Sequence, residues 1–362
     1  MYDVDDDASE EGALMRGMFY SSSSSSSLSS THSTSNESNT TGIEKYATTE
    51  SHENINEGPT DLVTTKLYLG NILLAQQSIG GEIAQRLWPS ASHLATFVLE
   101  FVRNKDEQSE DTSKISDILQ IEIDLKKTSF ELKEQARRQM EYQNLRSFFQ
   151  DHSNKSLNVL ELGAGVGLTG IKIATELPAR VILTDLELAL PFLHKNIELN
   201  ADKFVLNQNG VIAKKLGWGT DDHLNVLPFF ESKTDSVKNE ETNASNGSSD
   251  EKPLLVLAAD CVYFEELHFP LEKTLADILS TSANSSVCLI AAMRRTKRDT
   301  SFFKNLGKKT KTSTHTLNCT CIEETIMRNN TEEANENFRN RVVMRIYAIR
   351  WLPRSCMTPK KK

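Results

Sequence analysis

The feature that most constrains the fold is an apolar strand that runs into a glycine-rich loop and then into a helical pattern, over residues 158–170. Gly163, Gly165 and Gly167 let the backbone approach a ligand closely, because glycine has no side chain and tolerates left-handed turns. Apolar residues recur at helical spacing from Leu168 onward, so the loop opens a helix whose N-terminus favours negative charge or polar ligand atoms. This order predicts a cradle for a nucleotide cofactor.

Two acidic residues indicate which class of nucleotide cofactor the loop binds. Glu161 lies inside the strand, where a buried parallel strand is normally apolar, so its carboxylate needs a cationic or hydrogen-bonding partner. Asp185 follows the next apolar run, 181–184, close to the spacing at which an acidic residue binds both hydroxyls of a ribose. An intact ribose is therefore expected. Residues 165–170 also satisfy the dinucleotide fingerprint of dehydrogenases, so a nicotinamide-dependent oxidoreductase remains an alternative.

Polar stretches limit how much of the 362-residue chain can form a core. Residues 1–60 are rich in serine and acidic residues, and such a segment buries too little apolar surface to order itself, so we expect a disordered tail. We expect one domain over residues 61–353, with inserted loops near 104–117 and 220–252. Residues 354–362 are expected to form a basic C-terminal tail.

Composition excludes several classes of function. The chain starts without a basic segment followed by an apolar one, and no run is long enough to span a membrane, so we expect a cytoplasmic protein, with the nucleus as a second location. The five cysteines include no CxxC pair and no metal-ligand spacing, so no metal site is expected. A net charge of -9 argues against broad affinity for nucleic acid.

Apolar runs alternate with helical patterns, which predicts an α/β fold with a Rossmann-like, doubly wound sheet. The helical patterns cover residues 189–200 and 265–280. Two β-rich runs, 318–327 and 341–351, have no helix between them and predict an antiparallel C-terminal pair on a mostly parallel sheet. The other five runs, which bring the sheet to seven strands, are 158–162, 181–184, 211–216, 254–259 and 287–293.

Open parallel sheets bind ligands beyond the carboxyl ends of their strands, so the residues just past each strand are candidates for a site. Each has an ordinary alternative: an aspartate there can cap the next helix, an aromatic residue can belong to the core, and an arginine can be a surface charge. The residues in question are Gly163 to Gly167, Asp185, Trp218, Asp260 with Tyr263, and Arg294.

Several of these stretches together resemble the S-adenosylmethionine-dependent methyltransferases with seven β-strands. The resemblance rests on Glu161-Leu-Gly-Ala-Gly-Val-Gly, Asp185, Leu216-Gly-Trp218-Gly and above all Asp260-Cys-Val-Tyr263. Within that family, the chain is similar to the branch of protein-lysine methyltransferases with a DxxY motif after the fourth strand.

The segment before the glycine strand agrees with this branch. Trp88 and Pro89 resemble its tryptophan-containing entry helix, and proline suits the first helical position. A hairpin over residues 69–87, with its turn at Gly80 and Gly81, is expected before it. The resemblance covers roughly residues 66–102 and 155–352.

The resemblance implies the cofactor, S-adenosyl-L-methionine, and the site residues. It implies a protein substrate, with translation factors and chaperones as examples, and a lysine as the methylated residue; we expect a monomeric enzyme. Methylation of histidine, arginine or a small molecule stays open, as does a scaffold that binds the cofactor without catalysis. The implied cofactor-binding residues are Trp88, Glu161, Gly163, Gly165, Gly167, Asp185, Trp218 and Ala259, and the implied catalytic residues are Asp260 and Tyr263.

Two segments depart from the family pattern. The connection over residues 103–154 is longer than usual and includes an expected helix over 131–149, and the 220–252 insertion is atypical. We expect both to flank the cofactor rim and to influence the choice of substrate, and we expect deletion of the 1–60 tail to matter less.

Overall fold

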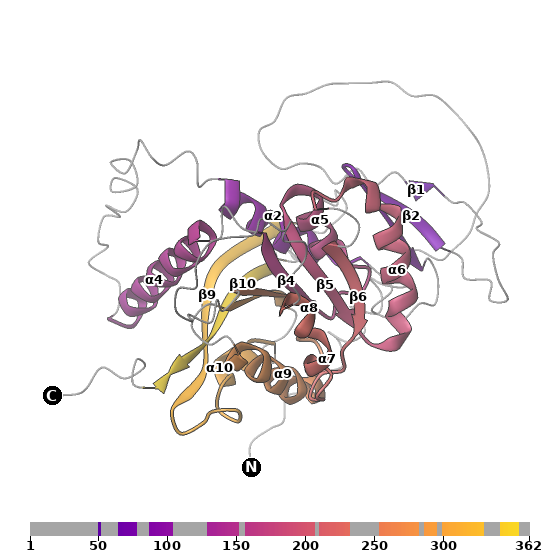
Figure 1. Ribbon diagram of the computed structural model, residues 1–362. Coiled ribbons are helices and arrows are strands. Elements are labelled where there is room, and N and C mark those ends of the chain that lie inside the picture. The colour runs from indigo at the N-terminus through magenta and orange to yellow at the C-terminus, as the bar shows by residue number, and fades with distance from the viewer. Residues whose placement is uncertain are drawn as a thin grey trace, which may run out of the picture. The chain divides into compact units, whose positions relative to one another are not determined.

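A seven-stranded sheet lies at the centre of the structure, which is a computed structural model (Figure 1). In spatial order its strands are β6 (Val211–Lys215), β5 (Ala179–Asp185), β4 (Leu157–Leu162), β7 (Leu254–Ala259), β8 (Val287–Arg294), β10 (Arg341–Pro353) and β9 (His315–Arg328). Neighbouring strands from β6 to β8 are parallel, whereas β10 is antiparallel to both β8 and β9. The predicted fold class, a mostly parallel sheet with an antiparallel C-terminal pair, is confirmed.

The structure describes part of the chain, and all of the described residues belong to one unit, Ala47–Lys362. The predicted tails, 1–60 and 354–362, and the loop 104–117 lie outside the described residues, apart from Glu50, Ser51 and Arg354. The described residues are 50–51, 64–77, 87–103, 129–151, 156–206, 210–231, 253–281, 286–294, 299–328 and 341–354.

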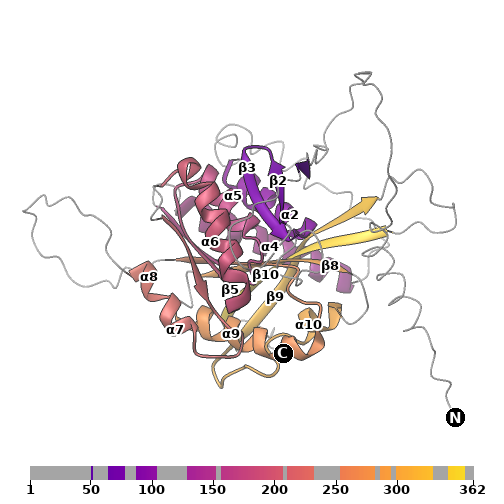
Figure 2. The ribbon, with the colours of Figure 1, turned by 90° about the vertical axis from the view of Figure 1, so that its right-hand side faces the viewer.

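Helices cover both faces of the sheet, and Figure 2 shows the two layers on opposite sides of it. Val159 of β4 belongs to one apolar cluster and its neighbour Leu160 to the other, because successive side chains of a strand point to opposite faces. The first layer contains α2 (Pro89–Arg103), α4 (Ser129–Asp151), α5 (Leu168–Glu176) and α6 (Leu190–Leu199). The second contains α7 (His223–Val226), α8 (Pro228–Glu231), α9 (His268–Thr281) and α10 (Asp299–Asn305).

Because helices bury both faces of the sheet, its strands have continuous apolar sequences. All six residues of β4 are buried, and so are five of the six residues of β7. Short 3₁₀ helices follow three of the regular elements: η2 (Glu187–Ala189), η3 (Ala201–Lys203) and η5 (Glu265–Leu267). None of the described helices is both long and apolar enough to cross a membrane.

A small three-stranded sheet lies before the main one, with the order β1 (Glu50–Ser51), β2 (Thr64–Leu69) and β3 (Ile72–Gln77). The predicted hairpin turn at Gly80 and Gly81 lies outside the described residues. The hairpin that the structure describes lies earlier in the chain and reverses at Gly70 and Asn71, where Gly70 adopts a φ of 63°. Ser51, which falls in the predicted tail, pairs with Lys66 of β2.

The two segments expected to depart from the family pattern contain helices among their described residues. The predicted helix over 131–149 is confirmed as α4, which is joined to β10 by a 2.6 Å ion pair between Glu141 and Arg350. The 220–252 segment is not a loop throughout, because residues 223–231 form α7 and α8. The Arg180 guanidinium donates to the carbonyls of Phe229 and Phe230 and so fixes the end of α8 beside the start of β5.

Candidate functional site

A cavity of about 380 Å³ opens at the carboxyl ends of β4, β5, β6 and β7. Its size falls within the range of about 300–1,000 Å³ that is typical of small-molecule sites. Nine of the ten predicted site residues line it: Trp88, Glu161, Gly163, Gly165, Asp185, Trp218, Ala259, Asp260 and Tyr263. Gly167 does not.

The glycine loop after β4 forms the floor of this cavity. Gly163, Gly165 and Gly167 have φ values of 60°, 57° and 82°, and residues with a side chain rarely adopt such a conformation. A Cβ on Gly163 would lie 2.8 Å from the Cys261 Sγ and 2.9 Å from the Trp218 ring. Gly163 is therefore required both by its backbone conformation and by close packing under the cavity.

Gly167 serves the turn and the packing of α5 instead of the cavity wall. It is the residue at the N-cap of α5, and a Cβ there would lie 2.9 Å from the Leu183 side chain and 3.0 Å from that of Leu193. The glycine keeps the start of the helix close to β5 and α6.

Glu161 is buried beneath the loop, with 1% of its surface exposed. Its Oε2 accepts the backbone N–H of Gly170 at 2.8 Å, in the first turn of α5. The hydrogen-bonding partner that the buried Glu161 carboxylate needs is thus a backbone N–H at the N-terminus of α5. Burial raises the pKa of Glu161 to about 7, although the hydrogen bonds from Gly170 and Thr169 act in the opposite direction.

Asp185 reaches the loop from the end of β5. Its Oδ2 accepts the N–H of Gly165 at 2.8 Å, and its Oδ1 accepts that of Leu186 at 2.7 Å. Burial raises the pKa of Asp185, and the two N–H groups oppose that rise. Leu186, not Asp185, is the N-cap of η2. Each carboxylate oxygen has a second lone pair, so both can still accept a ligand hydroxyl.

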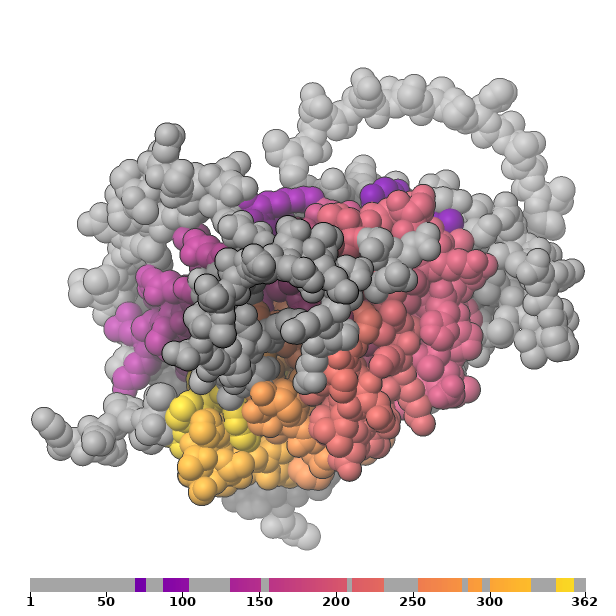
Figure 3. All heavy atoms as spheres, in the orientation of Figure 1, coloured from indigo at the N-terminus to yellow at the C-terminus, as the bar shows by residue number. Residues whose placement is uncertain are grey.

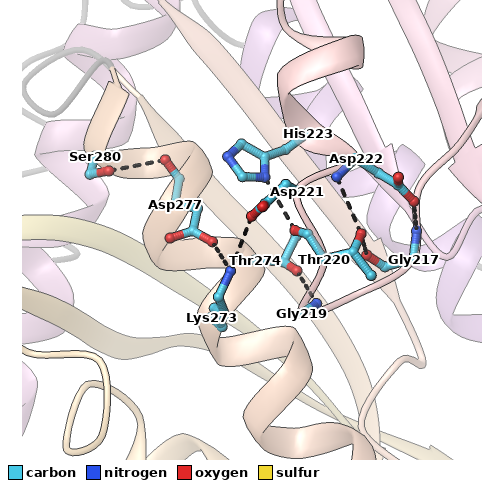
Figure 4. A network of polar contacts seen from close by, with 10 residues as sticks. All are labelled: Gly217, Gly219, Thr220, Asp221, Asp222, His223, Lys273, Thr274, Asp277 and Ser280. Carbon is cyan, nitrogen blue, oxygen red and sulfur yellow. Dashed lines mark hydrogen bonds and ion pairs between the residues drawn. The ribbon is translucent and has the colours of Figure 1, made fainter.

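The loop after β6 brings Trp218 to the cavity, and α9 holds this loop in place. Figure 4 shows the polar contacts between the loop and α9. The N–H of Gly219 donates to the Thr274 Oγ1 at 2.8 Å, and Lys273 forms a 3.7 Å ion pair with Asp221. A Cβ on Gly219 would lie 3.2 Å from Pro270, so the loop packs flat on the helix. The space-filling view shows the two segments side by side, in salmon and orange (Figure 3).

Asp260 stands out in its backbone conformation. Among the described residues it is the one non-glycine residue with a positive φ, 59°, and its N–H donates to the Ala291 carbonyl at 2.8 Å. Such a conformation is uncommon outside glycine, although aspartate tolerates it better than most residues. Strained residues of this kind cluster at active sites.

Neither ordinary alternative for the Asp260–Tyr263 segment is supported. The next helix, η5, has Phe264 as its N-cap and no side-chain cap, so Asp260 does not cap it. Tyr263 precedes that helix, is 37% exposed and packs against the Phe264 ring at 4.6 Å, so it is not a core aromatic. Tyr263 therefore lies at the mouth of the cavity.

Sequence reasoning missed several residues of the wall. Cys261 lies under Gly163 and donates its thiol to the Leu162 carbonyl at 3.4 Å, and burial holds its pKa well above the usual value. Leu267 and Pro270 line the cavity from the start of the helix after β7, a position that the strand-end rule could have indicated. Arg294, predicted on the same rim, does not line it. The described residues contain no cluster of three or more side chains suited to hold a metal ion.

A family model described as lysine methyltransferase matches residues 69–237 and 235–309. The chain belongs to this family. Two curated relatives are protein-lysine N-methyltransferase EFM6 of Saccharomyces cerevisiae, 35% identical over 156 residues, and protein N-lysine methyltransferase METTL21A of Mus musculus, 34% identical over 155 residues. The matches cover 41% and 43% of this chain, and 55% and 58% of those proteins.

The chain thus spans about half the length of the curated family members it matches. Among solved structures, a SAM-dependent methyltransferase from Agrobacterium tumefaciens is similar at 12% identity and a TM-score of 0.38, covering 82% of this chain and 71% of that one. That similarity is too distant to bear on function.

Proposed function

We propose that the protein is an S-adenosylmethionine-dependent protein N-methyltransferase that acts on a lysine side chain. The observation that carries this proposal is that the glycine loop and Asp185 line the same cavity as Asp260 and Tyr263. A cofactor on the loop and an acceptor beside Asp260 would therefore meet. Membership of the lysine methyltransferase family and the printed names of the relatives support it.

The residues of the cavity fit S-adenosylmethionine. The floor is closed to any side chain at Gly163, the Asp185 carboxylate can accept ribose hydroxyls, and Trp88 and Trp218 contribute apolar walls. Glu161 and Ala259 complete the same surface. When bound, the cofactor supplies an electrophilic methyl group on a sulfonium. The protein mainly aligns the two reactants, because an in-line displacement needs no covalent intermediate.

Asp260 and Tyr263 would act on the incoming amine. A free lysine has a pKa of about 10.4, and burial beside a positive charge lowers it, which favours the neutral nucleophile. The Asp260 carboxylate would accept hydrogen bonds from the amine and so orient it, while being too acidic to retain the proton, which passes to water. Tyr263 would offer its ring face or hydroxyl to the same amine.

The proposal extends to partners and location. The substrate would be a protein, such as a translation factor or a chaperone, and the enzyme would act as a monomer in the cytoplasm or nucleus. The proposal involves no membrane, and a nucleic-acid partner is not expected.

Two variants of Asp260 test the acceptor role. Asp260→Asn keeps the size and the tolerance of a positive φ but removes the charge, whereas Asp260→Gly also relieves the backbone. Both should bind S-adenosylhomocysteine as the parent does and transfer methyl groups about tenfold to a hundredfold more slowly, as expected for a lost charged hydrogen bond. Full turnover in Asp260→Asn, or calorimetric binding of NAD in place of S-adenosylhomocysteine, would contradict the proposal.

A further inference from the structure

Asn196 of α6 and Asn200, the residue at the C-cap of α6, attach the β2–β3 hairpin to the main domain. They lie four residues apart on one helix face, and both are fully buried. Asn200 accepts the N–H of Leu73 at 3.0 Å and donates to its carbonyl at 2.7 Å. In the same way, Asn196 accepts the N–H of Ala75 at 2.7 Å and donates to its carbonyl at 3.1 Å.

These hydrogen bonds cover one edge of the small sheet. β3 is an edge strand of that sheet, and residues two apart on a strand present their N–H and C=O groups to the same side. Four residues of helix rise about 6 Å and two residues of strand about 7 Å, so the two spacings match. The side-chain amides of Asn196 and Asn200 thus take the place of a neighbouring strand. Figure 2 shows α6 beside β3.

Asn196 differs from Asn200 in its remaining amide hydrogen. Its Nδ2 also donates to the Val166 carbonyl at 2.8 Å, whereas the Nδ2 of Asn200 donates to the Asn196 carbonyl of its own helix. Val166 lines the cavity between Gly165 and Gly167, both of which have positive φ values. One fully buried amide therefore joins the hairpin to the glycine loop.

We propose that Asn196 is a positioning residue, which holds the glycine loop in its cofactor-binding conformation and makes that conformation depend on the attached hairpin. The loop is then held from two sides, at the Gly165 N–H by Asp185 and at the Val166 carbonyl by Asn196. This inference rests on the proposed function, in which the cavity binds S-adenosylmethionine.

Asn200 provides a matched control for variants of Asn196. Asn196→Asp and Asn200→Asp each keep an oxygen for the N–H of β3 and lose the amide donor to its carbonyl, but only the first also loses the contact with the glycine loop. Both variants should lower the melting temperature, and Asn196→Asp should bind S-adenosylhomocysteine about tenfold more weakly than Asn200→Asp. If either buried carboxylate prevents folding, the pair Asn196→Ala and Asn200→Ala carries the same comparison.

The outcomes separate this inference from the proposed function. Equal calorimetric affinity in the two folded variants would overturn the positioning role while leaving the methyltransferase proposal intact. A parent protein that does not bind S-adenosylhomocysteine would instead overturn the proposed function. A weaker affinity in Asn196→Asp, with similar hydrogen exchange of the β3 amides in both variants, would support the positioning role.

Discussion

The carboxylate of Asp185 accepts the backbone N–H of Gly165 at 2.8 Å, which ties the end of β5 to the glycine loop after β4. The same carboxylate is the predicted acceptor for the cofactor ribose. One side chain therefore shapes the loop and would bind the ligand that the loop receives. Loss of its charge should affect both roles.

Asp185→Asn tests this double role. An amide offers one oxygen and one NH₂ group, so it cannot accept the N–H groups of both Gly165 and Leu186. We expect the affinity for S-adenosylhomocysteine to fall by about 1–3 kcal/mol, or roughly fivefold to 150-fold, in calorimetry. Asp202→Asn, which makes the same charge change at an exposed position, should leave the affinity unchanged. Equal affinities in the two variants would refute the ribose role of Asp185.

Gly163 can be compared with a glycine of nearly equal backbone conformation. Gly163 has a φ of 60° and Gly70 a φ of 63°, but a Cβ at Gly70 meets no atom within 4 Å. Alanine at either site carries a left-handed penalty of about 1–2 kcal/mol. Only Gly163→Ala should also displace Trp218 and reduce S-adenosylhomocysteine affinity. If Gly70→Ala weakened binding as much, backbone strain alone would explain the effect.

Sequence reasoning located the site because the fold imposes a simple rule. In a parallel sheet the carboxyl ends of the strands share one edge, so residues past different strands converge even when they are far apart in the chain. Asp185 is the last residue of β5 and Asp260 directly follows β7, and both line the cavity. Arg294 is the last residue of β8 and does not line it, because the cavity spans only the strands from β6 to β7.

Other features depend on long-range packing and leave no local signal. The positive φ of Asp260 is imposed by tertiary context, and Cys261 contacts Gly163 across almost a hundred residues of chain. The β2–β3 hairpin, which turns at Gly70 and Asn71, was not expected from the sequence. Asn196 could not be told from other polar helix residues in the sequence, because its three hydrogen bonds, to Ala75 and Val166, depend on the tertiary structure.

Because Glu161 is buried, we expect the stability of the folded protein to depend on pH. Its pKa rises from 4.5 to about 7 on folding because of burial, so the folded state binds its proton more tightly than the unfolded chain does. The stability linked to this group is fully present below pH 4.5 and is lost as the pH rises through about 7, by up to ~3 kcal/mol. Glu161→Gln should therefore melt higher than the parent at pH 8 and show little difference at pH 4.5. A melting difference independent of pH would show that Glu161 does not titrate in this range.

The residues that flank the segment 232–252 change the expectation that this segment influences substrate choice. On one side, the carbonyl of Phe230 binds Arg180 at the start of β5; on the other, the carbonyl of Pro253 accepts from Asn158 at the start of β4, at 3.5 Å. Both flanks thus lie at the amino edge of the sheet, one strand length, about 20 Å, from the edge that bears the cavity.

We therefore expect replacement of 232–252 by a short linker to leave S-adenosylhomocysteine affinity and methyl transfer unchanged. The loop-closure free energy should change little, because it varies slowly with loop length. Thr274→Val makes the contrasting change: it frees the Gly219 N–H and so loosens Trp218, and it should weaken cofactor binding. Incubating both variants with labelled cofactor in a lysate that lacks the enzyme measures transfer to native proteins. Loss of transfer in the linker variant, with its cofactor affinity intact, would show that the segment reaches the substrate despite leaving from the opposite edge.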